Sequence, residues 1–362
     1  MIRYFSGCLI GVVACLWVGS AWAASVVFLN PGSAPDPYWN SYSRFMQAAA
    51  HRLGMDLTIH YTDRDTRTLL TFARQALQGK QRPDYLVFSN ELNVAPEILR
   101  LSLGSGVKLL AVNNTFTADQ LSILGDLRSR YPDFLGSVVA NDEDGGYLIA
   151  KRLIDLHPPT SPGQPVEMLA FSGTNSTPVS LQREQGLYRA LAEHPNVRLR
   201  QIVLGGWRRD RAYEQAQVLL KRYPNVSLIW AASDLMAFGV MDAVRETGKK
   251  PGKDVLLGTI NDSTSALQAL LEGHLNVLVG GHFTLGGWAL VLLNDYDRAD
   301  SQTRKPIGTW RVRAMQIRER RDSVLFMQAN SRDDYDIDVR EFTGGQSPKD
   351  VAYPFVRVGA SN

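Results

Sequence analysis

The chain has 362 residues, of which 44% are hydrophobic and 21% charged, an ordinary composition for a soluble globular protein. Its formal net charge of +3, without a Lys/Arg stripe interleaved with aromatic residues, argues against a nucleic-acid-binding protein. The length exceeds what one hydrophobic core usually serves, so we expect two lobes.

The first 23 residues have the pattern of a secretory signal peptide. Arg3 supplies a positive start, residues 9–18 are apolar, and Ala21-Trp22-Ala23 is a small-x-small cleavage site. Both cysteines, Cys8 and Cys15, lie in this segment, so the mature chain would have no disulfide and no thiolate metal site. A retained membrane anchor and lipidation of a cysteine are the alternatives. We expect export to the periplasm.

After residue 24, short β-branched runs alternate with amphipathic stretches. The runs lack clean in–out alternation, as expected for parallel strands covered on both faces. The predicted strands are 26–29, 57–61, 85–88, 107–112, 137–140, 166–171, 198–203, 227–231, 255–259 and 276–279. The predicted helices are one entered at Asp36-Pro37 and closed by Gly54, then 68–78, 142–156, 179–193, 211–222, 235–247, 263–272 and 285–296. Such regular alternation indicates right-handed βαβ units and doubly wound parallel sheets.

Two sheets fit this pattern better than one sheet of all these strands, with a break after Ala140. We therefore predict an α/β fold of two doubly wound parallel-sheet lobes, joined by a hinge and separated by a ligand cleft. The predicted division is 24–140 plus 283–305 for the first lobe, 141–282 plus about 306–330 for the second, and 331–362 as a C-terminal extension. Within the tail, further strands are predicted near 307–312 and 323–327.

The motifs of common catalytic sites are absent from the sequence. There is no phosphate-binding P-loop, no H-E-x-x-H, no C-x-x-C and no G-x-S-x-G. Most of the histidines fall on helix or loop faces, and His282 alone ends a strand at an expected lobe crossing. We therefore predict no catalytic residue, no metal site and no cofactor. A secreted α/β enzyme remains the alternative from another class.

Polar and aromatic residues instead follow the predicted strand ends. In doubly wound sheets the carboxyl ends of the strands form the ligand crevice. Aromatic faces can cover the C–H surface of a sugar, while charged groups hydrogen-bond its hydroxyls. The candidate ligand-binding residues are Asp36, Tyr38, Trp39, Ser89, Asn90, Asn113, Ser172, Arg183, Asp234, Asn261 and His282. Three alternatives stay open: the aspartates could cap helices, Trp39 could belong to the core, and His282 could make a structural hydrogen bond.

In this order, these residues resemble the type I periplasmic binding proteins of the sugar-binding class, over about residues 26–296. Asp36-Pro37-Tyr38-Trp39 stands where that family has Asn-Pro and two aromatics, and Arg183 stands where it has a second-lobe arginine. Ser233-Asp234 matches its Asn/Asp-Asp pair. Within the class, the segments 84–89 and 108–115 look most like receptors of the autoinducer-2 type.

The resemblance implies a monomer whose lobes close on a small polar ligand, a sugar or a sugar-like molecule. It also implies a membrane partner for the closed form. That partner would be the permease of an ABC transporter or, as the alternative, the periplasmic domain of a sensor such as a histidine kinase. No nucleic-acid partner is expected.

Overall fold

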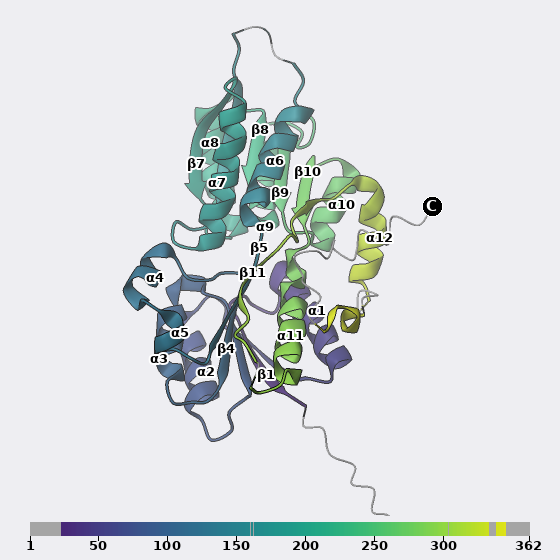
Figure 1. Ribbon diagram of the computed structural model, residues 1–362. Helices are drawn as coiled ribbons and strands as arrows, with labels where there is room; N and C mark the ends of the chain where they lie inside the picture. The colour runs from purple at the N-terminus through teal and green to yellow at the C-terminus, as the bar shows by residue number, and fades with distance from the viewer. Residues whose placement is uncertain (1–22, 160, 162, 303, 333–337, 345–362) are drawn as a thin grey trace, which may run out of the picture.

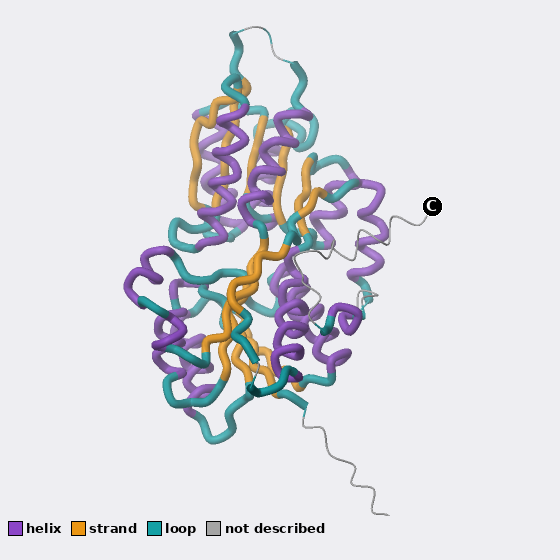
Figure 2. The backbone as a smooth tube through the Cα atoms, in the orientation of Figure 1, coloured by secondary structure: helices purple, strands orange, loops and turns teal. Residues whose placement is uncertain are grey.

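The computed structural model describes residues 23–159, 161, 163–302, 304–332 and 338–344. They form two α/β lobes, one above the other in Figure 1, and Figure 2 shows the strands gathered into two separate sheets. The predicted signal peptide lies outside the described residues, apart from its last position. Among the described helices, none is both long and apolar enough to cross a membrane.

The first lobe is built on a six-stranded parallel sheet with the spatial order β11-β5-β4-β3-β1-β2. Its strands are β1 (Ser25–Asn30), β2 (Asp56–Tyr61), β3 (Tyr85–Phe88), β4 (Lys108–Val112), β5 (Phe134–Ala140) and β11 (Gly308–Val312). Its helices are α1 (Pro37–Leu53), α2 (Thr66–Gln78), η1 (Glu91–Asn93), α3 (Ala95–Ser102), α4 (Ala118–Leu124), α5 (Leu127–Arg130) and α11 (Leu285–Arg298). The central strands β3 and β4 are buried almost throughout because helices cover both faces of the sheet.

The second lobe repeats this plan, with the spatial order β12-β10-β9-β8-β6-β7. Its strands are β6 (Val166–Ser172), β7 (Val197–Leu204), β8 (Leu228–Ala231), β9 (Leu256–Ile260), β10 (Val277–Gly280) and β12 (Gln316–Ile317). Its helices are α6 (Asp142–Leu156), α7 (Pro178–Glu193), α8 (Arg209–Arg222), α9 (Asp234–Glu246), α10 (Thr264–Glu272) and α12 (Arg320–Asn330). The short strand β12 pairs antiparallel with β10, whereas the other pairings are parallel.

The entry of α1 shows how local sequence places a side chain at the cleft. The Asp36 carboxylate accepts hydrogen bonds from the backbone N–H groups of Tyr38 and Trp39 at 3.1 and 3.3 Å, so it caps the helix as the sequence predicts. Pro37 occupies the first turn, and Gly54 ends the helix with φ of 68°. The cap therefore fixes where the two aromatic side chains leave the backbone.

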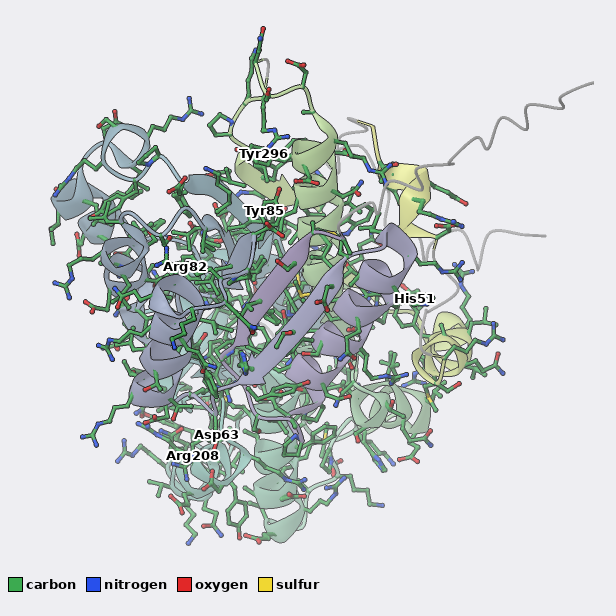
Figure 3. The ribbon with its side chains drawn as sticks, turned by 90° about the horizontal axis from the view of Figure 1, so that it is seen from below. His51, Asp63, Arg82, Tyr85, Arg208 and Tyr296 are labelled. Atoms are coloured by element: carbon green, nitrogen blue, oxygen red, sulfur yellow. The ribbon has the colours of Figure 1, made fainter. Side chains whose placement is uncertain are left out.

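Helix α11 returns the chain to the first lobe and packs against α1. Gly286 permits this close approach, because a Cβ atom there would lie 2.6 Å from the ring of Tyr42. At the other end of α11, Tyr296 meets Tyr85 of β3 edge-on at 6.5 Å between ring centroids, and Figure 3 shows the two side chains close together. The Tyr85 hydroxyl also donates to Asp297 at 2.9 Å.

The sequence prediction was wrong for two parts of the tail. Residues 308–312 form β11, which pairs with β5 in the first-lobe sheet instead of joining the second lobe. Residues 323–327 lie within α12, not in a strand, and the buried Phe326 and Ala329 are three residues apart, on one face of that helix. Of the predicted extension, η3 (Val339–Phe342) is described and sets Phe342 edge-on against Trp288 of α11 at 4.9 Å.

Three crossings between the lobes, at residues 140–142, 280–285 and 312–316, form the hinge of the described chain. Asn141 joins the first crossing to the third, because its side-chain oxygen accepts from the backbone N–H of Met315 at 2.9 Å. Gly281 joins the second to the third: its φ is 115°, and a Cβ atom there would lie 2.3 Å from the carbonyl oxygen of Ala314. The third crossing is therefore in direct contact with both the first and the second.

Candidate ligand site between the lobes

A cavity of about 450 Å³, partly open to solvent, lies between the lobes at the carboxyl ends of their strands. Each parallel strand except β5 and β11 is followed by residues that line it. The lining residues are Asp36, Tyr38, Trp39, Arg64, Glu91, Asn113, Asn114, Val179, Arg183, Trp207, Ser233, Leu235, Asn261 and His282.

Most of the predicted site residues line this cavity. Those that do are Asp36, Tyr38, Trp39, Asn113, Arg183, Asn261 and His282. Trp39 is only 3% exposed and also packs against Phe28 and Tyr42, so it belongs to the first-lobe core as well as to the cavity wall. Trp39 is therefore both a core residue, as the alternative interpretation held, and a residue of the cavity wall.

Four predicted residues are not among those that line the cavity, which corrects the prediction; they are Ser89, Asn90, Ser172 and Asp234. The Asn90 amide donates to Thr115 and Gln120 and holds a first-lobe turn together. The Ser172 hydroxyl lies between Ser180 and Glu184 inside the second lobe. Ser89 is fully buried and is not among the lining residues. A position after a strand end thus does not by itself bring a side chain to the cavity.

Arg183 is held rigidly at the cavity wall by a buried ion pair. Its Nε donates to the Asp142 carboxylate at 2.8 Å, and its Nη1 donates to the carbonyl oxygen of Ala232 at 2.8 Å. The two charged side chains are 4% and 2% exposed. Burial raises the pKa of Asp142, although the charge of Arg183 opposes that rise. The bonds fix the orientation of the guanidinium group before any ligand arrives.

Tyr38, Asn113 and His282 connect the first lobe to the hinge. The Tyr38 hydroxyl donates to Asn113 Oδ1 at 2.9 Å, and its ring stacks on His282 at 4.6 Å. Burial, with the charges of Arg183 and Arg318, lowers the pKa of His282 well below its usual value, so the ring is neutral. Because Arg183 Nη2 approaches His282 Nε2 at 3.3 Å, we assign the proton to Nδ1, a buried donor with no partner among the described residues.

Asp234 lies behind the cavity wall and orients Asn261. Its Oδ1 accepts from Asn261 Nδ2 at 2.8 Å, and its Oδ2 accepts from the Ser263 hydroxyl at 2.5 Å. Burial raises the pKa of Asp234 to about 6, despite these hydrogen bonds. Asp234 is 1% exposed, and its chain neighbours Ser233 and Leu235 line the cavity. Asp234 therefore does not line the cavity itself, as was predicted, but holds Asn261, which does.

Both the sequence and the fold of the chain match those of known proteins. The family described as "Periplasmic binding protein domain" matches residues 26–296. The chain belongs to the periplasmic binding proteins. A crystal structure of a periplasmic sugar-binding protein from Pseudomonas fluorescens is 47% identical, with a TM-score of 0.79, and the match covers 92% of this chain and 98% of that one. The family expected from the sequence motifs is confirmed.

Two curated relatives come from Escherichia coli. The galactofuranose-binding protein YtfQ is 27% identical over 40% of this chain and 46% of its own length. The D-allose-binding periplasmic protein is 22% identical over 71% of this chain and 79% of its own length. Both are named as binding proteins.

Several lining residues of this periplasmic binding protein are not among the predicted ones. Arg64 pairs with Asp36 at 3.2 Å, and the buried Glu91 accepts from the Asn114 amide at 3.0 Å. Burial raises the pKa of Glu91. Trp207 presents its ring from the turn after β7. The same strand-end rule, applied to β2 and β7 as well, would have singled out Arg64 and Trp207.

Proposed function

We propose that this periplasmic binding protein captures a small uncharged polyol, a sugar, between its lobes and delivers it to the permease of an ABC transporter. The observation that carries the proposal is the cavity at the strand ends, where amides, a phenol, an imidazole and aromatic rings from both lobes converge. The names of the relatives support it: they bind galactofuranose and D-allose, and the similar crystal structure is that of a sugar-binding protein.

The charges around the cavity favour an uncharged ligand. The two cations of the wall are already paired, Arg64 with Asp36 and Arg183 with Asp142. Glu91 and Asp234, by contrast, have no ion pair with a described residue and accept hydrogen bonds from neutral groups. A sugar acid or a phosphate would add a negative charge near these carboxylates, which costs free energy in a buried site. Hydroxyl groups would donate to acceptors on this wall instead.

The ligand would enter and leave the protein chemically unchanged. Capture would follow from closure of the lobes about the hinge, and the closed form would be the one that the permease recognises. A protein that acts in the periplasm must be exported, and the first 23 residues have the pattern of a signal peptide for export. The protein would act as a monomer.

Ligand-dependent stabilisation tests this function directly. A ligand that binds the folded state at 100 times its Kd adds about 2.7 kcal/mol to the free energy of unfolding. We expect a rise in Tm with at least one member of a panel of pentoses, hexoses and polyols. If that panel leaves Tm unchanged while sugar acids, sugar phosphates or amino acids raise it, the proposed ligand class is wrong.

The cavity wall is tested by removing one amide without disturbing the backbone. Asn113 has φ of 63°, which glycine adopts freely, so Asn113→Gly removes the amide and its hydrogen bond with Tyr38 while keeping the backbone conformation. We expect affinity for the sugar found in the panel to fall about 5–10-fold, which corresponds to one lost hydrogen bond. Asn93→Gly is the matched control, because Asn93 has φ of 61° but is exposed outside the cavity. Isothermal titration with equal affinity for both variants would remove Asn113 from the site.

A further inference from the structure

We propose that the ligand is a glycoside of at least two sugar units, and that the second unit occupies an outer groove between the lobes. This inference rests on the proposed function and specifies its substrate class. The outer groove is lined by Ser33, Pro35, Asp36, Pro37, Arg64, Trp207, Arg208, Arg209, Asp210, Tyr213, Leu235, Asp242 and Glu246. Its volume, including its open side, is about 1300 Å³.

The outer groove is continuous with the inner cavity. Asp36, Arg64, Trp207 and Leu235 line both spaces, and they come from both lobes. The first lobe contributes the loop 33–37, and the second contributes the turn after β7 together with α8 and α9. A ligand that extends beyond the inner cavity would therefore pass directly into the groove, still held between the two lobes.

Trp207 forms a fixed wall at the junction of the two spaces. Its φ is 64°, a left-handed conformation that is strained for a non-glycine residue. Its ring lies on the backbone of Gly173, where a Cβ atom would come within 2.0 Å of it, and the Arg183 guanidinium lies 5.8 Å from its centroid. Strain of this kind persists where the surrounding structure enforces it. Because the ring lines both spaces, it can cover the apolar faces of two adjoining sugar units.

The polar groups of the groove are suited to hydroxyls and not to a net charge. Arg209 pairs with Asp242 at 2.7 Å, Arg208 pairs with Asp210, and the Tyr213 hydroxyl donates to Glu246 at 2.6 Å. Cations and anions therefore alternate along the second-lobe wall, which offers both donors and acceptors.

On the wall shared with the cavity, the Nε of Arg64 is buried and has no hydrogen-bond partner among the described residues. It is a donor placed where one unit would join the next. An uncharged second sugar unit can hydrogen-bond to both the cationic and the anionic side chains of this wall. A charged unit would be repelled by the side chains of its own sign.

The competing interpretation is that the groove is only the passage by which a monosaccharide enters. Calorimetric titration of matched pairs separates the two: D-galactose with lactose and melibiose, D-glucose with cellobiose and maltose, D-xylose with xylobiose, and L-arabinose with arabinobiose. We expect at least one disaccharide to bind ten or more times as tightly as its monosaccharide. If monosaccharides bind and no disaccharide binds more tightly, the groove is a passage and this inference falls while the proposed function stands.

A pair of neighbouring substitutions localises the effect. Ser33 lines the groove, so Ser33→Trp fills it, whereas the adjacent Ala34 is exposed and is not a lining residue. We expect Ser33→Trp to abolish the tenfold preference for the disaccharide while leaving the monosaccharide affinity unchanged, and Ala34→Trp to keep both. Equal preference in the two variants would place the second unit elsewhere. If no saccharide in the set binds the parent chain, the proposed function itself fails.

Discussion

At the scale of single residues, Asp234 makes the stability of the protein depend on pH. Burial raises its pKa from an ordinary 3.8 to about 6. The folded state therefore binds this proton more tightly than the unfolded state. The resulting contribution to stability is complete below the unfolded pKa and is lost as the pH rises through the folded pKa. A shift of about two units corresponds to about 3 kcal/mol.

Asp234→Asn should remove this dependence, because the amide does not titrate but still offers an oxygen to Asn261. Between about pH 3.5 and pH 7, we expect the free energy of unfolding of the variant to rise by about 3 kcal/mol relative to the parent. Urea denaturation at half-unit pH steps measures the difference. Asp119→Asn, at an exposed position on α4, serves as the control. A difference between Asp234→Asn and the parent that stays constant with pH would contradict the raised pKa.

From the sequence, a residue could be assigned to the cavity wall only by its position directly after a predicted strand. The apolar runs end where the strands end, so the lining positions of Asn113, Asn261 and His282 were accessible from the sequence. Asn90 follows the end of β3 and Ser172 is the last residue of β6, but their side chains bond to partners within their own lobes. These partners lie 8 to 30 residues away in the sequence, and a pattern of residue types does not say which of them will meet.

At the scale of elements, the contact between the second and third hinge crossings depends on Gly281. Alanine there would adopt a left-handed φ and place its Cβ against the Ala314 carbonyl. We expect Gly281→Ala to lower the free energy of unfolding by roughly 2–5 kcal/mol, from backbone strain and overpacking together. Gly308→Ala is the matched control: its φ is 75°, but nothing lies within 4 Å of the added atom.

Gly308→Ala should therefore show the strain alone, roughly 1–2 kcal/mol. Equal losses of stability in the two variants, measured by urea denaturation, would mean that the crossings do not press on one another at Gly281.

Elements with a dense apolar pattern were predicted better than those at the edges. Strands β3 and β4 are apolar throughout and buried on both faces, so their runs stand out in the sequence. Strand β11 alternates between exposed and half-buried residues, and such an edge strand does not reveal which sheet it joins. In α12, the short apolar run at residues 323–327 resembles a strand, but the segment is helical and packs against α10.

At the scale of the whole molecule, binding should bring the two lobes together about the hinge. Both cysteines of the chain lie before residue 23, so the chain from Ala24 onward can be labelled at introduced cysteines alone. Ala34 and Glu214 are exposed residues on opposite lobes, each next in sequence to a residue that lines the outer groove. A donor and an acceptor dye at Ala34→Cys and Glu214→Cys therefore report on the distance between the lobes.

We expect energy transfer between these dyes to rise on titration with the sugar that stabilises the protein, with the midpoint at the calorimetric Kd. The closed form would contact the ligand from both lobes, and a ligand shifts an equilibrium only through such a difference in affinity. The control pair is Ala34→Cys with Ile123→Cys, because Ile123 is 80% exposed and lies in the same lobe as Ala34. Saturation with sugar that leaves both pairs unchanged would show that the lobes do not move on binding, and that the ligand enters a cavity already formed.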